Sequence, residues 1–237
     1  HKTGMLRRPV VVFDKGVDGV CDPHDDPTIQ IDKEGYVWIF VAGRGNTRPG
    51  IRYRSRKPYD ISAFDYVNES IMAYPQVHYH PEKGFFLFFT RYDGVRQLFC
   101  QTSPDGREWS GYRQIASIID EGETKSGHYQ FTNLCGDKLM CCFNRHINGD
   151  VDTRTNIYYI QSEDWGRTWT TADGRRVALP VTRRNDISLI RDFQSERRNC
   201  YIKDINFGNQ IRSYVMQPYT LCLLYTSPSP RDSTSSR

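Results

Sequence analysis

A repeat is the feature that most constrains the fold of this chain. Three stretches share one order: a glycine turn, an apolar run, an arginine, a strand-like run ending in serine, and a turn ending at an aromatic residue. The equivalent serines are Ser55, Ser103 and Ser162, and a fourth unit starts at Asp192. Units of about 40–50 residues with four short strands are typical of β-propeller blades. The sequence therefore predicts an all-β chain of four-stranded blades.

The repeat also sets the expected domain boundaries. We expect a partial propeller over residues 1–220, with blades over residues 20–65, 70–115, 125–175 and 190–220. Residues 221–237 lose the strand pattern and are rich in Ser, Pro and Arg. This tail resembles translated sequencing-adapter DNA, so we expect it to be artefactual or disordered.

Composition excludes several classes of protein. Aromatic residues make up 13% of the chain at a mean hydropathy of −0.66, which suits half-buried strands with polar turns. No run approaches the roughly 18 apolar residues of a membrane span. A net charge of +4 is too small to indicate nucleic acid binding. The sequence lacks a phosphate-binding glycine loop and zinc-ligand spacing, so we expect neither cofactor nor metal. Four of the seven cysteines lie in apolar runs, where buried thiols are expected: Cys100, Cys141, Cys142 and Cys200.

The turn that ends each repeat carries the sharpest motif. Residues 162–169 read Ser-Glu-Asp-Trp-Gly-Arg-Thr-Trp, and residues 103–109 are a shortened version. This motif resembles the Asp box, the bacterial neuraminidase repeat of the sialidase superfamily. The resemblance implies a structural role, in which Asp164 and Asp105 accept backbone N–H bonds, glycine adopts the unusual φ and tryptophan packs between strands.

Shorter motifs narrow the resemblance. Residues 23–29, Tyr74-Pro75 and residues 127–130 resemble the branch of neuraminidase-repeat proteins that includes ulvan-lyase-like polysaccharide lyases, over about residues 10–215. Complete members of that branch typically carry seven blades, so about three are expected to be missing here. The resemblance also implies an acidic polysaccharide or oligosaccharide as partner, a secreted or periplasmic location, and a monomer when complete.

Position in the repeat nominates the site residues, because propeller ligands bind where several blades converge. Three arginines recur at one repeat position and would form a cationic patch for carboxylate or sulfate groups. Asp26, at the start of a strand, is expected to be structural. The starts of inner strands contribute His24, Asp25, Tyr74, Gln76, His128, Tyr129 and Gln130, and the ends of second strands contribute Arg44, Arg91, Arg145 and His146.

The leading functional hypothesis is β-elimination on a uronic-acid polysaccharide. Arg145, Arg91 or Gln130 would neutralise the carboxylate, and His128 or Tyr129 would remove the C5 proton. His146 or His24 would then protonate the departing oxygen.

Two alternatives stay open. A sialidase-like exo-glycosidase would use Asp25 or Asp26 as acid, but the chain lacks a clear Arg-Ile-Pro motif and no Tyr–Glu pair can be placed. A non-catalytic carbohydrate-binding propeller would use tyrosine, tryptophan and arginine side chains for binding alone.

Overall fold

The computed structural model describes residues 9–14, 26–207 and 213–215. Strands dominate these residues, and their only helical elements are two short 3₁₀ turns, η2 (Ile147–Gly149) and η3 (Val151–Thr153). The chain divides into two compact units. The first unit comprises residues 1–91 and 100–113, and the second comprises residues 92–99 and 114–237.

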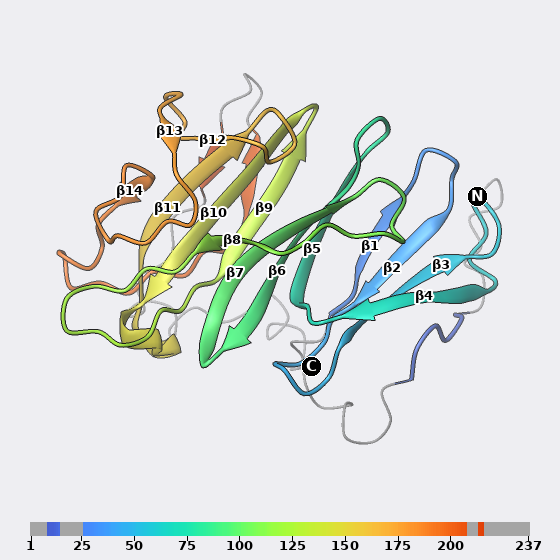
Figure 1. The fold of residues 1–237 in the computed structure, drawn as a ribbon, viewed down its shortest axis with the longest axis horizontal. Helices are drawn as coiled ribbons and strands as arrows, with labels where there is room; N and C mark the ends of the chain where they lie inside the picture. The colour runs from blue at the N-terminus through green and yellow to red at the C-terminus, as the bar shows by residue number, and fades with distance from the viewer. Residues whose placement is uncertain (1–8, 15–25, 208–212, 216–237) are drawn as a thin grey trace, which may run out of the picture. The chain divides into compact units, whose positions relative to one another are not determined.

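The first sheet of the first unit is a four-stranded antiparallel meander (Figure 1). Gly35 (φ +89°) makes the turn between its first two strands. Asp32 fixes this turn by accepting hydrogen bonds from Tyr36 N (2.8 Å) and Trp38 Nε1 (2.8 Å). The strands are β1 (Thr28–Ile31), β2 (Val37–Val41), β3 (Gly50–Ser55) and β4 (Phe64–Ser70).

The second sheet has the same order and again four strands (Figure 1). In the first unit, aromatic side chains of β6 and of the turn after β7 pack with those of β2: the ring of Phe85 lies 5.1 Å from that of Trp38, and the ring of Trp109 lies 6.0 Å from that of Phe40. The strands are β5 (Ala73–His80), β6 (Gly84–Asp93), β7 (Val95–Ser103) and β8 (Arg113–Ala116).

The third sheet, in the second unit, follows the path β9-β10-β11-β12-β13, and β14 pairs with β11 beside it. Its two central strands, β10 and β11, are buried along almost their whole length, and Cys142 and Tyr159 from them pack with Phe193 and Ile202 in one core. The strands are β9 (Gln130–Cys135), β10 (Lys138–His146), β11 (Arg154–Ser162), β12 (Trp169–Thr170), β13 (Arg176–Val177) and β14 (Leu189–Arg191), followed by the separate pair β15 (Ile205–Phe207) and β16 (Ser213–Val215).

The Asp-box aspartates lie in turns, as the motif predicts. Asp164 accepts hydrogen bonds from Thr168 N (2.8 Å) and Thr168 Oγ1 (2.7 Å), and Gly166 has φ +80°. Asp105 accepts from the N–H groups of the two residues that follow Gly106, at 2.9 and 3.0 Å. Trp169 is buried. These aspartates therefore hold hairpin turns.

Cys100, Cys141, Cys142 and Cys200 are buried free thiols, as predicted. No helix within the described ranges has the length and apolar character needed to cross a membrane.

Candidate functional site

Several of the predicted site residues meet in the second unit, just before β9 and at the end of β10. Residues 127–129 pair with residues 144–146 there, because His146 N donates to Gly127 O (2.7 Å) and Asn144 N donates to Tyr129 O (3.1 Å). The β10–β11 register shifts between Phe143 and Arg145, and His146 then lies opposite Arg154.

This pairing separates the candidates onto two faces. Successive side chains of a strand point to opposite faces, and directly paired residues point to the same face. Tyr129 and His146 therefore share one face, and their rings lie 5.0 Å apart. His128 and Arg145 occupy the opposite face. The sequence hypothesis placed the acid, the base and the carboxylate-binding arginine in one site. The structure divides these residues into two clusters, one on each face of the strands.

Tyr129 lies between two arginines. The guanidinium carbon of Arg96 lies 5.4 Å from the centre of the Tyr129 ring, and that of Arg154 lies 4.9 Å from it. The guanidinium carbon of Arg96 also lies 5.3 Å from the centre of the Tyr92 ring, and that of Arg154 lies 4.6 Å from the centre of the Tyr201 ring. Tyr129 is half-buried, so two positive charges and a phenol meet close to the surface.

His146 is the unusual residue of this face. Its side chain is buried, and neither ring nitrogen has a hydrogen-bond partner among the described residues. Burial is the main cause that lowers the pKa of His146 to about 3, and its interactions with His128 and with the charges of Arg154 and Arg96 add to it. The ring fits because residue 127 is glycine: a Cβ there would lie 2.9 Å from His146 Nδ1. A buried imidazole without partners is costly, and such groups concentrate at functional sites.

His128 has both ring nitrogens engaged by the backbone. Its Nε2 accepts from Ile118 N (3.2 Å), so the proton lies on Nδ1, which donates to Asn144 O (2.9 Å). Burial is the main cause that lowers the pKa of His128 to about 4, and the charge of Arg145 adds to it. His128 is therefore a neutral residue that ties the segment before β9 to β10, and it has no nitrogen free to take a substrate proton.

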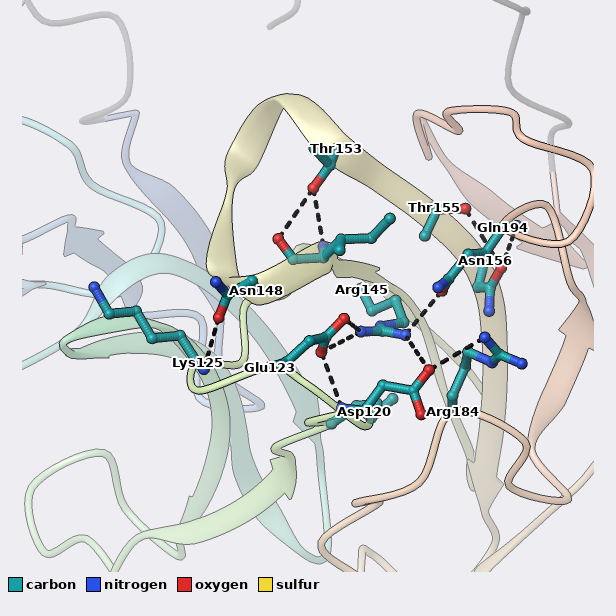
Figure 2. Close-up of polar contacts among 12 residues, drawn as sticks. Asp120, Glu123, Lys125, Arg145, Asn148, Thr153, Thr155, Asn156, Arg184 and Gln194 are labelled. Carbon is teal, nitrogen blue, oxygen red and sulfur yellow. Dashed lines mark hydrogen bonds and ion pairs between the residues drawn. The ribbon is translucent and has the colours of Figure 1, made fainter.

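Arg145 differs from its expected role as a substrate clamp. Its side chain is fully buried and pairs with the carboxylate of Glu123, while Nη1 donates to Gln194 Oε1 (2.8 Å). Asp120 lies 3.6 Å from Nη1 and also pairs with Arg184 at 3.2 Å. Figure 2 shows these carboxylates pointing at the guanidinium. The charge of Arg145 is thus balanced inside the protein.

The remaining candidates make other contacts within their own units. Gln130 is buried in β9, where Cys141 Sγ donates to its Oε1 (3.7 Å). In the first unit, the backbones of Arg44 and Arg48 form an isolated antiparallel β-bridge, and the guanidinium carbon of Arg91 lies 4.6 Å from the centre of the Tyr112 ring. Tyr74 (φ 49°) lies within an irregularity of the β5–β6 register, between the paired residues Ala73 and Gln76. His24 and Asp25 lie outside the described residues.

Arg96 and Arg154 are the functional candidates that sequence reasoning missed. Arg96 lies near the start of β7, a position that the repeat comparison did not consider. Arg154 is the first residue of β11 and pairs with His146. Counting residues along the β10–β11 hairpin from Ser162 does not predict this pair, because a bulge between Phe143 and Arg145 shifts the register. Within the described part of the chain, no cluster of three or more His, Cys, Asp and Glu side chains could hold a metal ion.

Comparisons with known proteins agree with this architecture. The chain is 26% identical over 226 residues to an ulvan lyase from Pseudoalteromonas sp. (strain PLSV), covering 77% of this chain and 44% of that protein. It is 27% identical over 192 residues to an ulvan lyase from Alteromonas sp. (strain LOR), covering 68% and 39%. The chain therefore spans less than half the length of these curated relatives.

Solved structures of an ulvan lyase of polysaccharide lyase family PL25 superpose with TM-scores of 0.73 and, bound to -[GlcA(1-4)Rha3S]-, 0.71, at 21% and 20% identity. Both matches cover 82% of this chain and 51% of the solved chain. The predicted all-β, propeller-type fold is confirmed by this likeness and by the four-stranded antiparallel sheets. A family model described as a BNR repeat-containing family member matches residues 7–216, so this chain belongs to the BNR repeat-containing family.

Proposed function

We propose that the full-length protein is a polysaccharide lyase that cleaves a uronic-acid-containing polysaccharide by β-elimination. The observation that carries this proposal is Tyr129, held between Arg96 and Arg154 and in ring contact with the unpaired His146. Elimination needs positive charge beside the uronate carboxylate and a group that can move a proton. The names of the curated relatives, all ulvan lyases, support the same reaction class.

Each residue then has a distinct part in the reaction. Arg96 and Arg154 neutralise the carboxylate and so favour loss of the C5 proton. The phenolate oxygen of Tyr129 takes that proton as the bond between C4 and its glycosidic oxygen breaks, and the Tyr129 hydroxyl so formed gives the proton to the departing oxygen. The electron pair of the C5–H bond becomes the new C4=C5 double bond, so no water is added.

His146, His128 and Arg145 act in this scheme as positioning residues. His146 lies under Tyr129 as a neutral imidazole, since its pKa of about 3 is far below neutral pH. His128 fixes the backbone from which Tyr129 projects, through its hydrogen bond to Asn144 O. Arg145 holds Glu123 and Gln194 beneath the same strands.

The proposed substrate is an acidic polysaccharide in which glucuronate is 1,4-linked to sulfated rhamnose. A structural neighbour has been solved with -[GlcA(1-4)Rha3S]- bound, which supports this choice. A polymer of this kind is too large to enter a cell intact, so we also propose that the protein acts in the periplasm or outside the cell.

The test follows ultraviolet absorbance of the unsaturated uronate while the full-length protein acts on ulvan. We expect a rising signal with wild-type protein and a loss of about 10²–10⁴-fold in rate for Tyr129→Phe, the usual effect of removing a proton-transfer group. Tyr66→Phe, at an exposed tyrosine, is the matched control and should keep the full rate. Full activity of Tyr129→Phe would refute the assignment, and reducing ends released without absorbance would point to hydrolysis.

A further inference from the structure

A cavity lies wholly within the first unit, and a buried arginine is among the residues that line it. The cavity holds about 310 Å³ and lies along β3, β4 and the turn after β7. Arg52 of β3 is 1% exposed, and its guanidinium carbon lies 4.4 Å from the centre of the Trp109 ring. Burial lowers the pKa of Arg52 to about 10, so the side chain remains charged at neutral pH.

The hydrogen bonding of Arg52 is incomplete on one edge. Nη1 donates to Asn68 Oδ1 (3.1 Å), whereas Nε and Nη2 have no partner among the described residues. Nε and Nη2 form the side edge of a guanidinium, which binds two oxygens of a carboxylate or sulfate through parallel hydrogen bonds. Stacking on Trp109 engages the flat face of the guanidinium, but it leaves Nε and Nη2 without a hydrogen-bond acceptor. Unpaired buried donors of a charged group are costly, so the edge calls for an acceptor.

The rest of the cavity suits an acidic sugar. Its volume lies at the lower end of small-molecule sites, which matches one monosaccharide unit. Trp109 provides an apolar surface, and the exposed Arg107 adds a second positive charge at the lining. Asn68 joins the two arginines, because its Nδ2 also donates to Arg107 O (2.8 Å). The exposed Glu69 is the one carboxylate among the lining residues, so the lining keeps a net positive charge.

We propose that this cavity is a binding site for a carboxylate- or sulfate-bearing sugar unit, anchored by the side edge of Arg52. The site shares no residue with the Tyr129 cluster, and it does not depend on the lyase reaction. It would give the protein a second contact with an acidic polysaccharide chain.

The test is a titration of the full chain followed by nuclear magnetic resonance of the arginine Nε–H groups, with the Arg52 signal assigned through its loss in Arg52→Lys. Sodium glucuronate should shift this signal saturably, and glucose should not. Asn68→Asp places a carboxylate beside Nη1, which supplies an internal counter-ion and repels an added anion. We expect it to weaken glucuronate binding about tenfold or more.

Asn133→Asp, the same change in the third sheet, is the matched control and should leave the affinity unaltered. An Arg52 signal that ignores glucuronate, or equal affinity in Asn68→Asp and wild type, would overturn the site. Inorganic sulfate that binds as tightly as glucuronate would overturn its recognition of a sugar. None of these outcomes depends on the rate of elimination, so failure here is distinguishable from failure of the lyase proposal.

Discussion

At the residue scale, Arg145 and Arg154 lie near each other on paired strands but face different surroundings. Arg145 is buried against Glu123, whereas no acidic partner of Arg154 is found in the described ranges, and its Nε donates to Val151 O (2.8 Å). Arg145→Met should lower the free energy of unfolding by about 3–5 kcal/mol, because Glu123 is left buried and unpaired.

Arg154→Met is the matched variant and should instead lower kcat/KM, with unfolding little changed, because its charge is available to substrate. Urea denaturation and steady-state kinetics on ulvan separate the two effects. A large loss of stability in Arg154→Met with unchanged kcat/KM would contradict these roles.

His128 predicts how stability depends on pH. Its pKa is about 4 in the folded protein and about 6.5 in an unfolded chain. Between these values the unfolded chain binds more protons, so the free energy of unfolding falls as the pH drops from about 6.5 to 4, by an amount on the order of 2 kcal/mol from this group. Urea denaturation at several pH values measures the slope. His128→Gln should flatten it, and an unaltered slope would show that His128 is not held neutral.

At the element scale, Gly127 sets the distance between the segment before β9 and the end of β10. An alanine Cβ would lie 2.9 Å from His146 Nδ1 and 3.2 Å from Gly149 Cα. Gly127→Ala should therefore displace His146 and lower the elimination rate about tenfold or more, since small misplacements at a site are costly. Gly111→Ala, where a Cβ meets nothing within 4 Å, should leave the rate unchanged. Equal rates for both variants would argue against a role for the His146 position.

A substitution in the Asp-box turn should lower the free energy of unfolding and leave the elimination rate unchanged. Asp164 accepts from Thr168 N, Thr168 Oγ1 and Ser162 Oγ, and Asp164→Ala leaves these donors without their acceptor. We expect the free energy of unfolding to fall by about 1–3 kcal/mol, with kcat on ulvan retained below the unfolding temperature. The exposed Glu163→Ala should be near neutral. A large fall in kcat for folded Asp164→Ala would place the turn in the site.

Strand order and turns were the most predictable elements, because apolar runs and turn motifs are local signals. The apolar run at residues 85–89 lies in β6, and the serine that ends each repeat closes β3, β7 and β11. The irregularity at Asn144 was not predictable, since register depends on the partner strand. For the same reason, β14 was missed: it ends just before Asp192, where a new unit was expected, and pairs back with β11.

At the scale of the whole molecule, the repeat predicted the fold class but not the contacts that each candidate residue makes. Repeat position grouped Arg44, Arg91 and Arg145 as one patch, yet Arg145 pairs with Asp120 and Glu123, which lie in the loop between β8 and β9. His128, Tyr129 and His146 lie close together in the structure, and their assignment to a site stays a prediction. The face of the sheet to which each of these side chains points follows from the pairing of the strands and from the bulge in β10. Neither the pairing nor the bulge can be read from the sequence.

The most direct test of the account is the mass spectrum of the end products that the full-length protein releases from ulvan. Elimination across C4–C5 adds no water, so each product should carry an unsaturated uronate at its new non-reducing end and weigh one water less than the hydrolysis product. We expect such masses after treatment with the wild-type protein and none after treatment with Tyr129→Phe. Saturated oligosaccharides that carry the extra water, or intact polymer after prolonged incubation, would contradict it.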